Sequence, residues 1–285
     1  TKTRVLSWAA MMAVLINIPC NYLFIFCFNL GISGAAMASS LAEAGSLLIL
    51  VCYIFQKKVD KDHFGLKAAY DGKRLAALLR LSVWSMMHAF ISVAPWFLFF
   101  VAIERLGEMQ LAVSNITRSV STVFFVIVNS FAATSGSLVS NLIGAGEGRN
   151  LFRLCYKVLR LGYAVGIPLI VFALLFNRQI VGFYTDNAQL MEFAHYPFIV
   201  MLLNYAFALP GYVYVNAVTG TGDTRMAFVF QVSTIVIYLA YLYLLSYSSI
   251  VSLSVYLTAE YLFVMLLGVQ SYVYLKRKQY TLSRD

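Results

Sequence analysis

Eight long apolar runs constrain this chain more than any other feature of its sequence. They cover about residues 5–29, 33–55, 78–103, 109–141, 154–176, 191–217, 226–246 and 251–274. Each run is about 20 or more mainly apolar residues long, which is the length that a helix needs to cross a bilayer. Backbone at that depth must satisfy its own hydrogen bonds, so the runs predict helices. We therefore predict an all-α polytopic membrane protein with eight transmembrane helices.

The composition excludes several other classes of protein. The chain is 61% hydrophobic and only 12% charged, whereas an ordinary soluble domain is about 25% charged. Four cysteines are too few for a disulfide scaffold. The net charge of +9 comes from short basic clusters between the apolar runs, so it does not predict nucleic-acid binding. The glycine-containing turns at 144–148 and 220–225 lack phosphate-binding motifs, and we expect neither enzymatic activity nor a cofactor.

The distribution of basic residues predicts the orientation of the chain. If the loops alternate, 18 of the 21 Lys and Arg residues lie on one side of the membrane. The other side, or the membrane itself, holds only Arg105, Arg118 and Arg178. Since cytoplasmic loops carry the excess of Lys and Arg, both ends of the chain are predicted to be cytoplasmic.

Two segments of similar length suggest an internal repeat. Residues 3–58 and 224–278 each begin with Thr-Arg, carry an Ala-Glu pair in their second apolar run and end in basic residues. Chance similarity between two apolar hairpins is the alternative. A true repeat predicts two parallel six-helix lobes, a known transporter plan, in a natural protein of twelve spans. The domains would then be the last two helices of an N-terminal lobe (1–56), a cytoplasmic linker (57–76), a complete six-helix C-terminal lobe (77–278) and a cytoplasmic tail (279–285).

Four ionisable residues lie deep within the predicted spans, namely Glu43, His88, Arg118 and Glu260. Each costs roughly 2.5–3.5 kcal/mol on insertion scales, so each is a candidate functional group. Arg118 cannot lose its proton and needs a partner, and Glu260 is the best candidate within the same lobe. A static pair that fixes helix packing is the alternative. His88 is either a proton relay or a hydrogen-bonded packing residue.

The first hairpin carries oxygen ligands of the kind that hard cations prefer. Asn17 and Asn21 stand four residues apart on one helix face, and Ser39 and Glu43 lie on adjacent turns of the next helix. These four residues form a predicted coupling-cation site. Hydrogen bonding between the two helices is the alternative explanation.

Aromatic and polar residues of the third, fourth and sixth spans predict a substrate cavity. The predicted cavity residues are Trp84, His88, Asn115, Arg118, Asn204 and Tyr205. Aromatic side chains suit large cations through stacking and cation–π attraction. Lipid-facing aromatic residues are the alternative, because such residues are common at membrane interfaces.

Several short motifs resemble the multidrug and toxic compound extrusion (MATE) transporters. The motifs are Gly31–Ser39, Ser140–Glu147, Leu175-Phe176, Phe183–Asp186 and Gly220–Thr224, in the order that the family's last eight spans would require. The resemblance implies a two-lobe exporter of organic cations that is driven by Na⁺ or H⁺ entry. It also implies that Asn17, Asn21 and Ser39 match cation-site positions, together with an aspartate in a span that this sequence does not include. The acids that some relatives carry in the C-terminal lobe would fall near Ser92 and Ala208, so no such acidic site is expected.

The sequence thus predicts a secondary antiporter that exports organic cations or drugs in exchange for Na⁺ or H⁺ by alternating access. The alternative is a lipid-linked saccharide flippase of the same broad superfamily, which should need several cavity cations for phosphate groups. A membrane-embedded transferase is disfavoured because no DDxxD-like Mg²⁺ motif is present. The expected location is a bacterial cytoplasmic membrane. The expected partners are an amphipathic or cationic small molecule and the lipid bilayer, without nucleic acid, and we expect a monomer.

Overall fold

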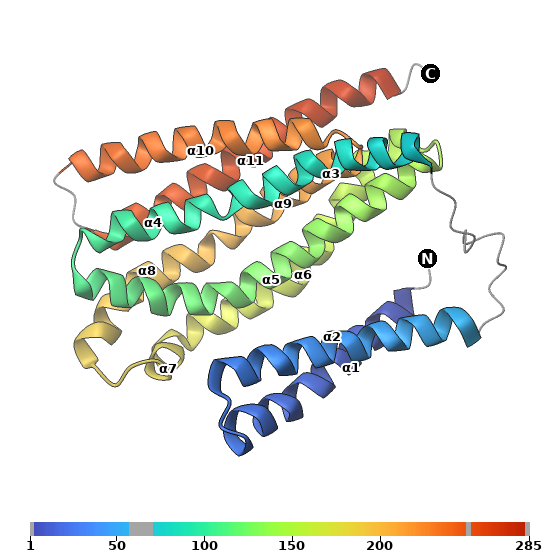
Figure 1. Ribbon diagram of the computed structural model, residues 1–285. Helices are drawn as coiled ribbons and strands as arrows, with labels where there is room; N and C mark the ends of the chain where they lie inside the picture. The colour runs from blue at the N-terminus through green and yellow to red at the C-terminus, as the bar shows by residue number, and fades with distance from the viewer. Residues whose placement is uncertain (1–2, 57–70, 249–251, 283–285) are drawn as a thin grey trace. The chain divides into compact units, whose positions relative to one another are not determined.

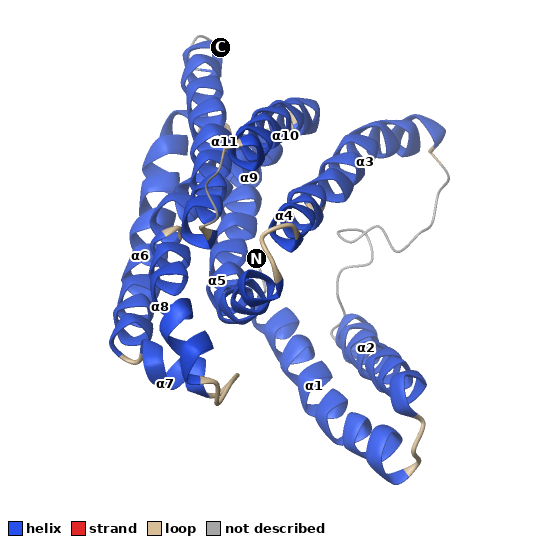
Figure 2. Cartoon of the chain, turned by 90° about the vertical axis from the view of Figure 1, so that its left-hand side faces the viewer, coloured by secondary structure: helices blue, strands red, loops and turns tan. Residues whose placement is uncertain are grey.

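The computed structural model describes residues 3–56, 71–248 and 252–282, and nearly all of them are helical (Figures 1 and 2). The helices are α1 (Thr3–Asn21), the π-helix η1 (Tyr22–Cys27), α2 (Gly31–Gln56), α3 (Gly72–Ser92), α4 (Ala94–Glu104), α5 (Glu108–Gly144), the 3₁₀ turn η2 (Gly148–Asn150), α6 (Leu151–Leu175), α7 (Asn177–Gly182), α8 (Ala188–Leu203), α9 (Tyr205–Gly220), α10 (Thr224–Tyr247) and α11 (Leu253–Leu282). Within these ranges, eight helical segments are long and apolar enough to span a membrane. The predicted all-α fold with eight spans is confirmed.

The chain divides into two compact units, Thr1–Gly72 and Lys73–Asp285. We call the first the hairpin, because it consists of α1, η1 and α2, and the second the bundle, which holds α4 to α11 and nearly all of α3. Most of the predicted linker 57–76 lies outside the described residues. The assignment of the two units to an N-terminal and a C-terminal lobe stays a prediction.

The hairpin packs through small side chains. Ala9 of α1 and Ala38 and Ala42 of α2 are buried, whereas large residues such as Trp8 and Leu48 are exposed. Small residues let two helix backbones approach closely, which is the usual basis of helix association within lipid. Pro19 lies inside α1 and cannot donate a backbone hydrogen bond, and the helix continues as the π-helical η1 a few residues later.

In the bundle, α9 is the central helix and packs most closely against α5 and α11. Glycines make the crossing with α5 close. A Cβ atom built on Gly220 would lie 2.3 Å from the carbonyl oxygen of Gly136, and one on Gly136 would lie 2.9 Å from the carbonyl oxygen of Asn216. Any larger residue at Gly220 would therefore push the two helices apart.

Two of the spans in the bundle are interrupted near their middle. The third span changes from α3 to α4 at Val93, just before Pro95, which has no N–H to donate to the preceding turn (Figure 1). The sixth span changes from α8 to α9 at Asn204. A few residues later, Pro210 leaves the carbonyl of Ala206 without its helical donor, and the Tyr163 hydroxyl of α6 donates to that oxygen at 2.6 Å. Neighbouring side chains thus satisfy backbone that a broken membrane helix exposes.

Candidate functional site

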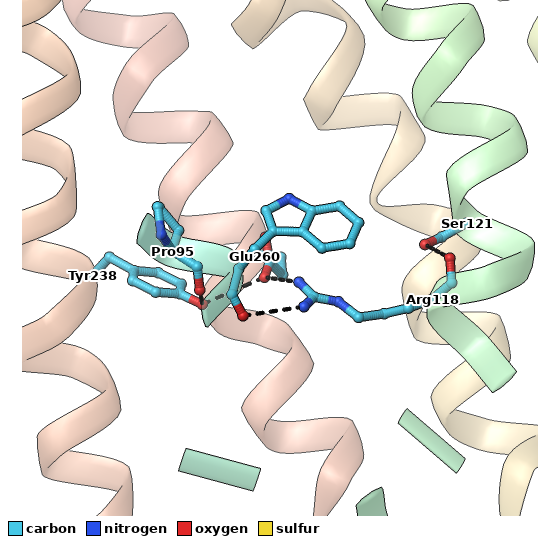
Figure 3. Close-up of polar contacts among 6 residues, drawn as sticks. Pro95, Arg118, Ser121, Tyr238 and Glu260 are labelled. Carbon is cyan, nitrogen blue, oxygen red and sulfur yellow. Dashed lines mark hydrogen bonds and ion pairs between the residues drawn. The ribbon is translucent and has the colours of Figure 1, made fainter. Parts of the chain in front are cut away.

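The centre of the bundle holds a buried ion pair between α5 and α11. Arg118 Nη2 lies 3.3 Å from Glu260 Oε1, and the two side chains are 4% and 13% exposed. The hydroxyl of Tyr238, a fully buried residue of α10, donates to the same carboxylate oxygen at 3.4 Å. Figure 3 shows Arg118 and Tyr238 approaching Glu260 from opposite sides. The consecutive helices α10 and α11 therefore meet α5, which is distant from them in sequence, at one carboxylate.

Three aromatic rings of α4 surround the guanidinium group. The Cζ atom of Arg118 lies 4.0 Å from the ring centroid of Trp96, 4.8 Å from that of Phe99 and 4.7 Å from that of Phe100. The spacing of these residues, three and four apart, places them on one face of the helix. The backbone carbonyl of Trp96 also accepts from Arg118 Nη1 at 3.4 Å. The α4 helix therefore supplies both cation–π contacts and a hydrogen-bond acceptor to the cation.

A cavity adjoins the ion pair. It is lined by polar residues from the centre of the spans (Arg118, Ser121, Asn204, Glu260) and by aromatic and aliphatic residues (Trp96, Phe124, Phe125, Val128, Met201, Leu202, Tyr205, Ala208, Tyr212, Val264). The volume open to the centres of water molecules is about 60 Å³. Since one water needs roughly 10–15 Å³ of such volume, the cavity has room for a few waters.

Two polar atoms of the cavity-lining residues have no hydrogen-bond partner within the described part of the chain. They are the donor Nε of Arg118 and the acceptor Oδ1 of Asn204, and both are buried. Asn204 is the residue at which the sixth span is interrupted. Buried polar atoms usually find a partner in protein or water, so these two mark a place where a ligand, a water or a side-chain movement is expected.

The structure brings together only part of the predicted substrate cavity. Arg118, Asn204 and Tyr205 line the cavity. Trp84 lies elsewhere, with its ring centroid 5.4 Å from that of Phe228 and 5.5 Å from Arg225 Cζ. Asn115 is exposed, and His88 has a buried Nε2 without a partner among the described residues. Neither of these two residues is among those that line the cavity beside Glu260.

Sequence reasoning did not single out Phe99, Phe100 or Tyr238 for this site. The first two could have been found, because Pro95 starts a new helix and the aromatic residues that follow it repeat at helical spacing. Tyr238 had no comparable signal, since α10 carries several tyrosines and nothing in the sequence shows which one faces Glu260.

The predicted coupling-cation residues of the hairpin lie on adjoining faces of α1 and α2. Asn21 Nδ2 donates to Asn17 Oδ1 at 2.8 Å, and Asn17 Nδ2 lies 3.4 Å from Ser39 Oγ. The buried Oδ1 of Asn21 has no partner among the described residues. Ser39 and Glu43 are exposed. The first three residues form a connected set of amide and hydroxyl groups, and Glu43 lies one turn further along α2.

A second charged cluster lies at the end of the bundle, where its one acid, Asp223, stands between two spans. Asp223, in the turn between α9 and α10, accepts hydrogen bonds from Lys278 and Tyr274 of α11. Burial alone would raise the pKa of Asp223, but these two hydrogen bonds and the charge of Lys278 outweigh it and hold the pKa below its usual value. The cluster ties the last turns of α11 to the turn between α9 and α10.

Comparison with known proteins identifies the family. The MatE family model matches residues 85–244, which is more than half of the chain and includes Trp96, Arg118, Asn204 and Tyr238. The chain belongs to the MatE family. The multidrug and toxin extrusion protein 1 of Mus musculus is 26% identical over 138 residues, and that of Homo sapiens is 27% identical over the same length. Each of these matches covers 47% of this chain and 24% of the relative.

Solved MATE structures share the fold of the chain. A MATE crystal structure in the straight conformation has a TM-score of 0.86 at 15% identity, covering 98% of this chain and 63% of the other. The chain therefore spans about a quarter of the length of the curated relatives and somewhat less than two thirds of that solved chain. MATE proteins are transporters, and this MatE chain is a multi-pass membrane protein with eight candidate spans among its described residues.

Proposed function

We propose that the protein is a secondary efflux transporter that exports organic cations and amphipathic drugs in exchange for Na⁺ or H⁺. The observation that carries the proposal is the cavity beside Glu260, which adjoins the middle of two interrupted spans and combines aromatic walls with a few polar groups. Interrupted spans near the midplane are typical of transporter binding sites. The names of the curated relatives support multidrug extrusion as the whole protein's activity.

The hairpin is the proposed site of the coupling ion. Asn17, Asn21 and Ser39 already contact one another, and the unpartnered Oδ1 of Asn21 is available to a cation or to a protonated ligand. Glu43 lies one turn away and adds a negative charge. An ion bound here drives alternating access only if it binds one conformation of the transporter more tightly than the other.

The charges in the cavity favour an exporter of cations over a flippase of lipid-linked saccharides. A flippase should need cationic side chains that are available to phosphate groups. Arg118 is the cation among the residues that line this cavity, and it is paired with Glu260. We further propose that the protein acts as a monomer in a bacterial cytoplasmic membrane, with both ends of this chain in the cytoplasm. The excess of Lys and Arg in the loops on that side supports this orientation.

The proposal is tested by ethidium efflux from bacteria that lack their own major efflux pumps. Cells that express the protein should lose ethidium faster than cells with an empty vector. In inverted vesicles, an imposed Na⁺ or proton gradient should drive ethidium uptake. Asn21→Ala should raise the ion concentration or gradient needed for half-maximal transport, while Ser40→Ala should leave it unchanged, because the Ser40 hydroxyl bonds to Ala36 within its own helix.

Two results would contradict the proposal. Ethidium retention equal to that of empty-vector cells, with the protein present in the membrane, would exclude export of this cation. Equal ion dependence in the Asn21→Ala variant and the unmodified protein would remove the hairpin from the coupling site.

A further inference from the structure

The contact between Arg118 and Glu260 is loose for a buried ion pair. Charge-assisted N–H···O hydrogen bonds are usually about 2.7–2.9 Å long, and Arg–carboxylate pairs are frequently bidentate. Here a single nitrogen reaches a single oxygen at 3.3 Å, and Tyr238 donates to that same oxygen. The carboxylate therefore holds the guanidinium group by one long contact.

The other groups around Arg118 contact its guanidinium group and not the aliphatic stem that connects it to α5. The three rings of α4 and the carbonyl of Trp96 contact the planar cationic end of the side chain. Aromatic faces attract desolvated organic cations through the ring quadrupole. The rings, the carbonyl and the Glu260 carboxylate form a cation box, by which we mean Trp96, Phe99, Phe100 and Glu260. Arg118 fills this box in the structure.

The cavity also offers Arg118 a second position. Arg118 Nε is a buried donor without a partner among the described residues, and Asn204 Oδ1 is a buried acceptor in the same condition. Both residues line the one cavity, with only water-sized space inside it. If Arg118 turned toward Asn204, the donor and the acceptor could satisfy each other, and Glu260 would be left without its cation.

We propose that Arg118 is a resident, displaceable occupant of the cation box, and that a free guanidinium-like cation can replace it at Glu260 while Asn204 holds the displaced side chain. This proposal rests on the proposed export function and adds an exchange step to it. A cation that enters the cavity competes with a tethered one, so the buried carboxylate is never left uncompensated. In this scheme Asn204 is a positioning residue, because it acts through Arg118.

The experiment measures the thermal unfolding of purified protein in lipid nanodiscs, with guanidinium chloride added at up to about 20 mM. In Arg118→Met the box is empty, so guanidinium should raise the melting temperature saturably by about 2–5 °C. Urea is planar and of similar size but uncharged, and NaCl matches the ionic strength. Neither should raise the melting temperature. Arg118→Met/Glu260→Met lacks the carboxylate and should not respond to guanidinium. Arg178→Met is a matched control, because Arg178 is exposed and lies outside the box.

A second pair of variants keeps Arg118 and tests whether guanidinium can replace it at Glu260. This pair also tests the proposal if Arg118→Met does not fold. Asn204→Asp gives Arg118 a charged alternative acceptor, so Glu260 should become available and guanidinium should stabilise this variant. Asn204→Leu removes the acceptor and should show no such stabilisation. The proposal is overturned if guanidinium stabilises neither Arg118→Met nor Asn204→Asp. It is also overturned if guanidinium stabilises Arg118→Met and Arg118→Met/Glu260→Met to the same extent. Equal stabilisation of Asn204→Asp and Asn204→Leu would overturn it as well.

This readout does not involve transport. Failure of ethidium export with a normal guanidinium response would reject the proposed function and leave the cation box in place. Normal export without a guanidinium response would reject displacement of Arg118 alone.

Discussion

The hairpin and the bundle both carry polar side chains within apolar spans, but they enclose them very differently. In the hairpin, Asn17 and Asn21 are partly exposed and Ser39 is exposed. In the bundle, Arg118 is 4% exposed and contacts a carboxylate of α11 and three rings of α4, and a hydroxyl of α10 donates to that carboxylate. The hairpin groups that contact one another are neutral amides and a hydroxyl, with the exposed Glu43 one turn away, whereas the contacting pair in the bundle carries full charges.

The difference shows where a substitution should matter most. A neutral group that loses one hydrogen bond between membrane helices forfeits little, about 0.6 kcal/mol on average. A full charge that loses its charged partner in an enclosed site costs several kcal/mol. The stability of the bundle should therefore depend on its polar pair far more than the stability of the hairpin depends on its own polar set.

The largest effect is expected from removing one member of the ion pair. Glu260→Leu and Arg118→Leu should each destabilise the protein by about 3–5 kcal/mol, and the double variant should recover most of that loss. The loss should be greater for Glu260→Leu, since a lone carboxyl can take up a proton while a lone guanidinium cannot release one. Unfolding by a denaturing detergent measures the stability of the unmodified protein, the two single variants and the double variant. Additive losses in the double variant would show that the two side chains act independently.

An intermediate effect is expected at the crossing of α5 and α9. Gly220→Ala places a methyl group 2.3 Å from the Gly136 carbonyl oxygen and should cost about 1–3 kcal/mol through forced separation of the helices. Gly144→Ala is the control, because a Cβ atom there has nothing within 4 Å. Thermal unfolding compares the two variants. If both melt alike, the crossing is looser than its geometry indicates, and close packing does not set the bundle apart from the hairpin.

The smallest effect is expected in the hairpin. Ser39→Ala removes one hydrogen bond of 3.4 Å at an exposed site and should change the stability by less than about 1 kcal/mol. Ser40→Ala, one residue away, should have a similarly small effect. The same unfolding assay checks both. A loss at Ser39 that approaches the loss at Glu260 would mean that the hairpin site is as sensitive as the ion-pair site.

The eight spans could be predicted because each is encoded locally. A run of about 20 apolar residues is long enough to cross the bilayer, and within lipid it must form a helix to satisfy its backbone hydrogen bonds. Both conclusions follow without knowledge of the neighbouring segments. Even the interruption of the third span has a local signal in Pro95. The interruption at Asn204 does not, because Pro210 lies six residues further on and Pro197 lies within the unbroken α8.

The candidate site could be predicted only in outline. Arg118 and Glu260 stood out because charges in a span are rare, and similar depth suggested that they could meet. Depth gives no information about which way a residue faces around its helix. Trp84 and His88 of α3 were therefore predicted to line the cavity. The aromatic residues that contact the guanidinium group instead lie in α4, beyond the Val93 interruption. In the hairpin, Glu43 was grouped with Ser39 by sequence spacing alone.

The cluster of Asp223, Tyr274 and Lys278 has a mechanical consequence. It fastens the end of α11 to the turn that joins α9 and α10. Toward the opposite ends of the same two helices, the hydroxyl groups of Tyr241 of α10 and Thr258 of α11 lie 2.9 Å apart. Because α10 and α11 are joined toward both ends, we expect them to rock as one pair about the turn that connects them to α9. Rocking of these helices should therefore be least at Asp223 and grow along their length, so that a small rotation at this turn becomes a larger displacement beside Glu260.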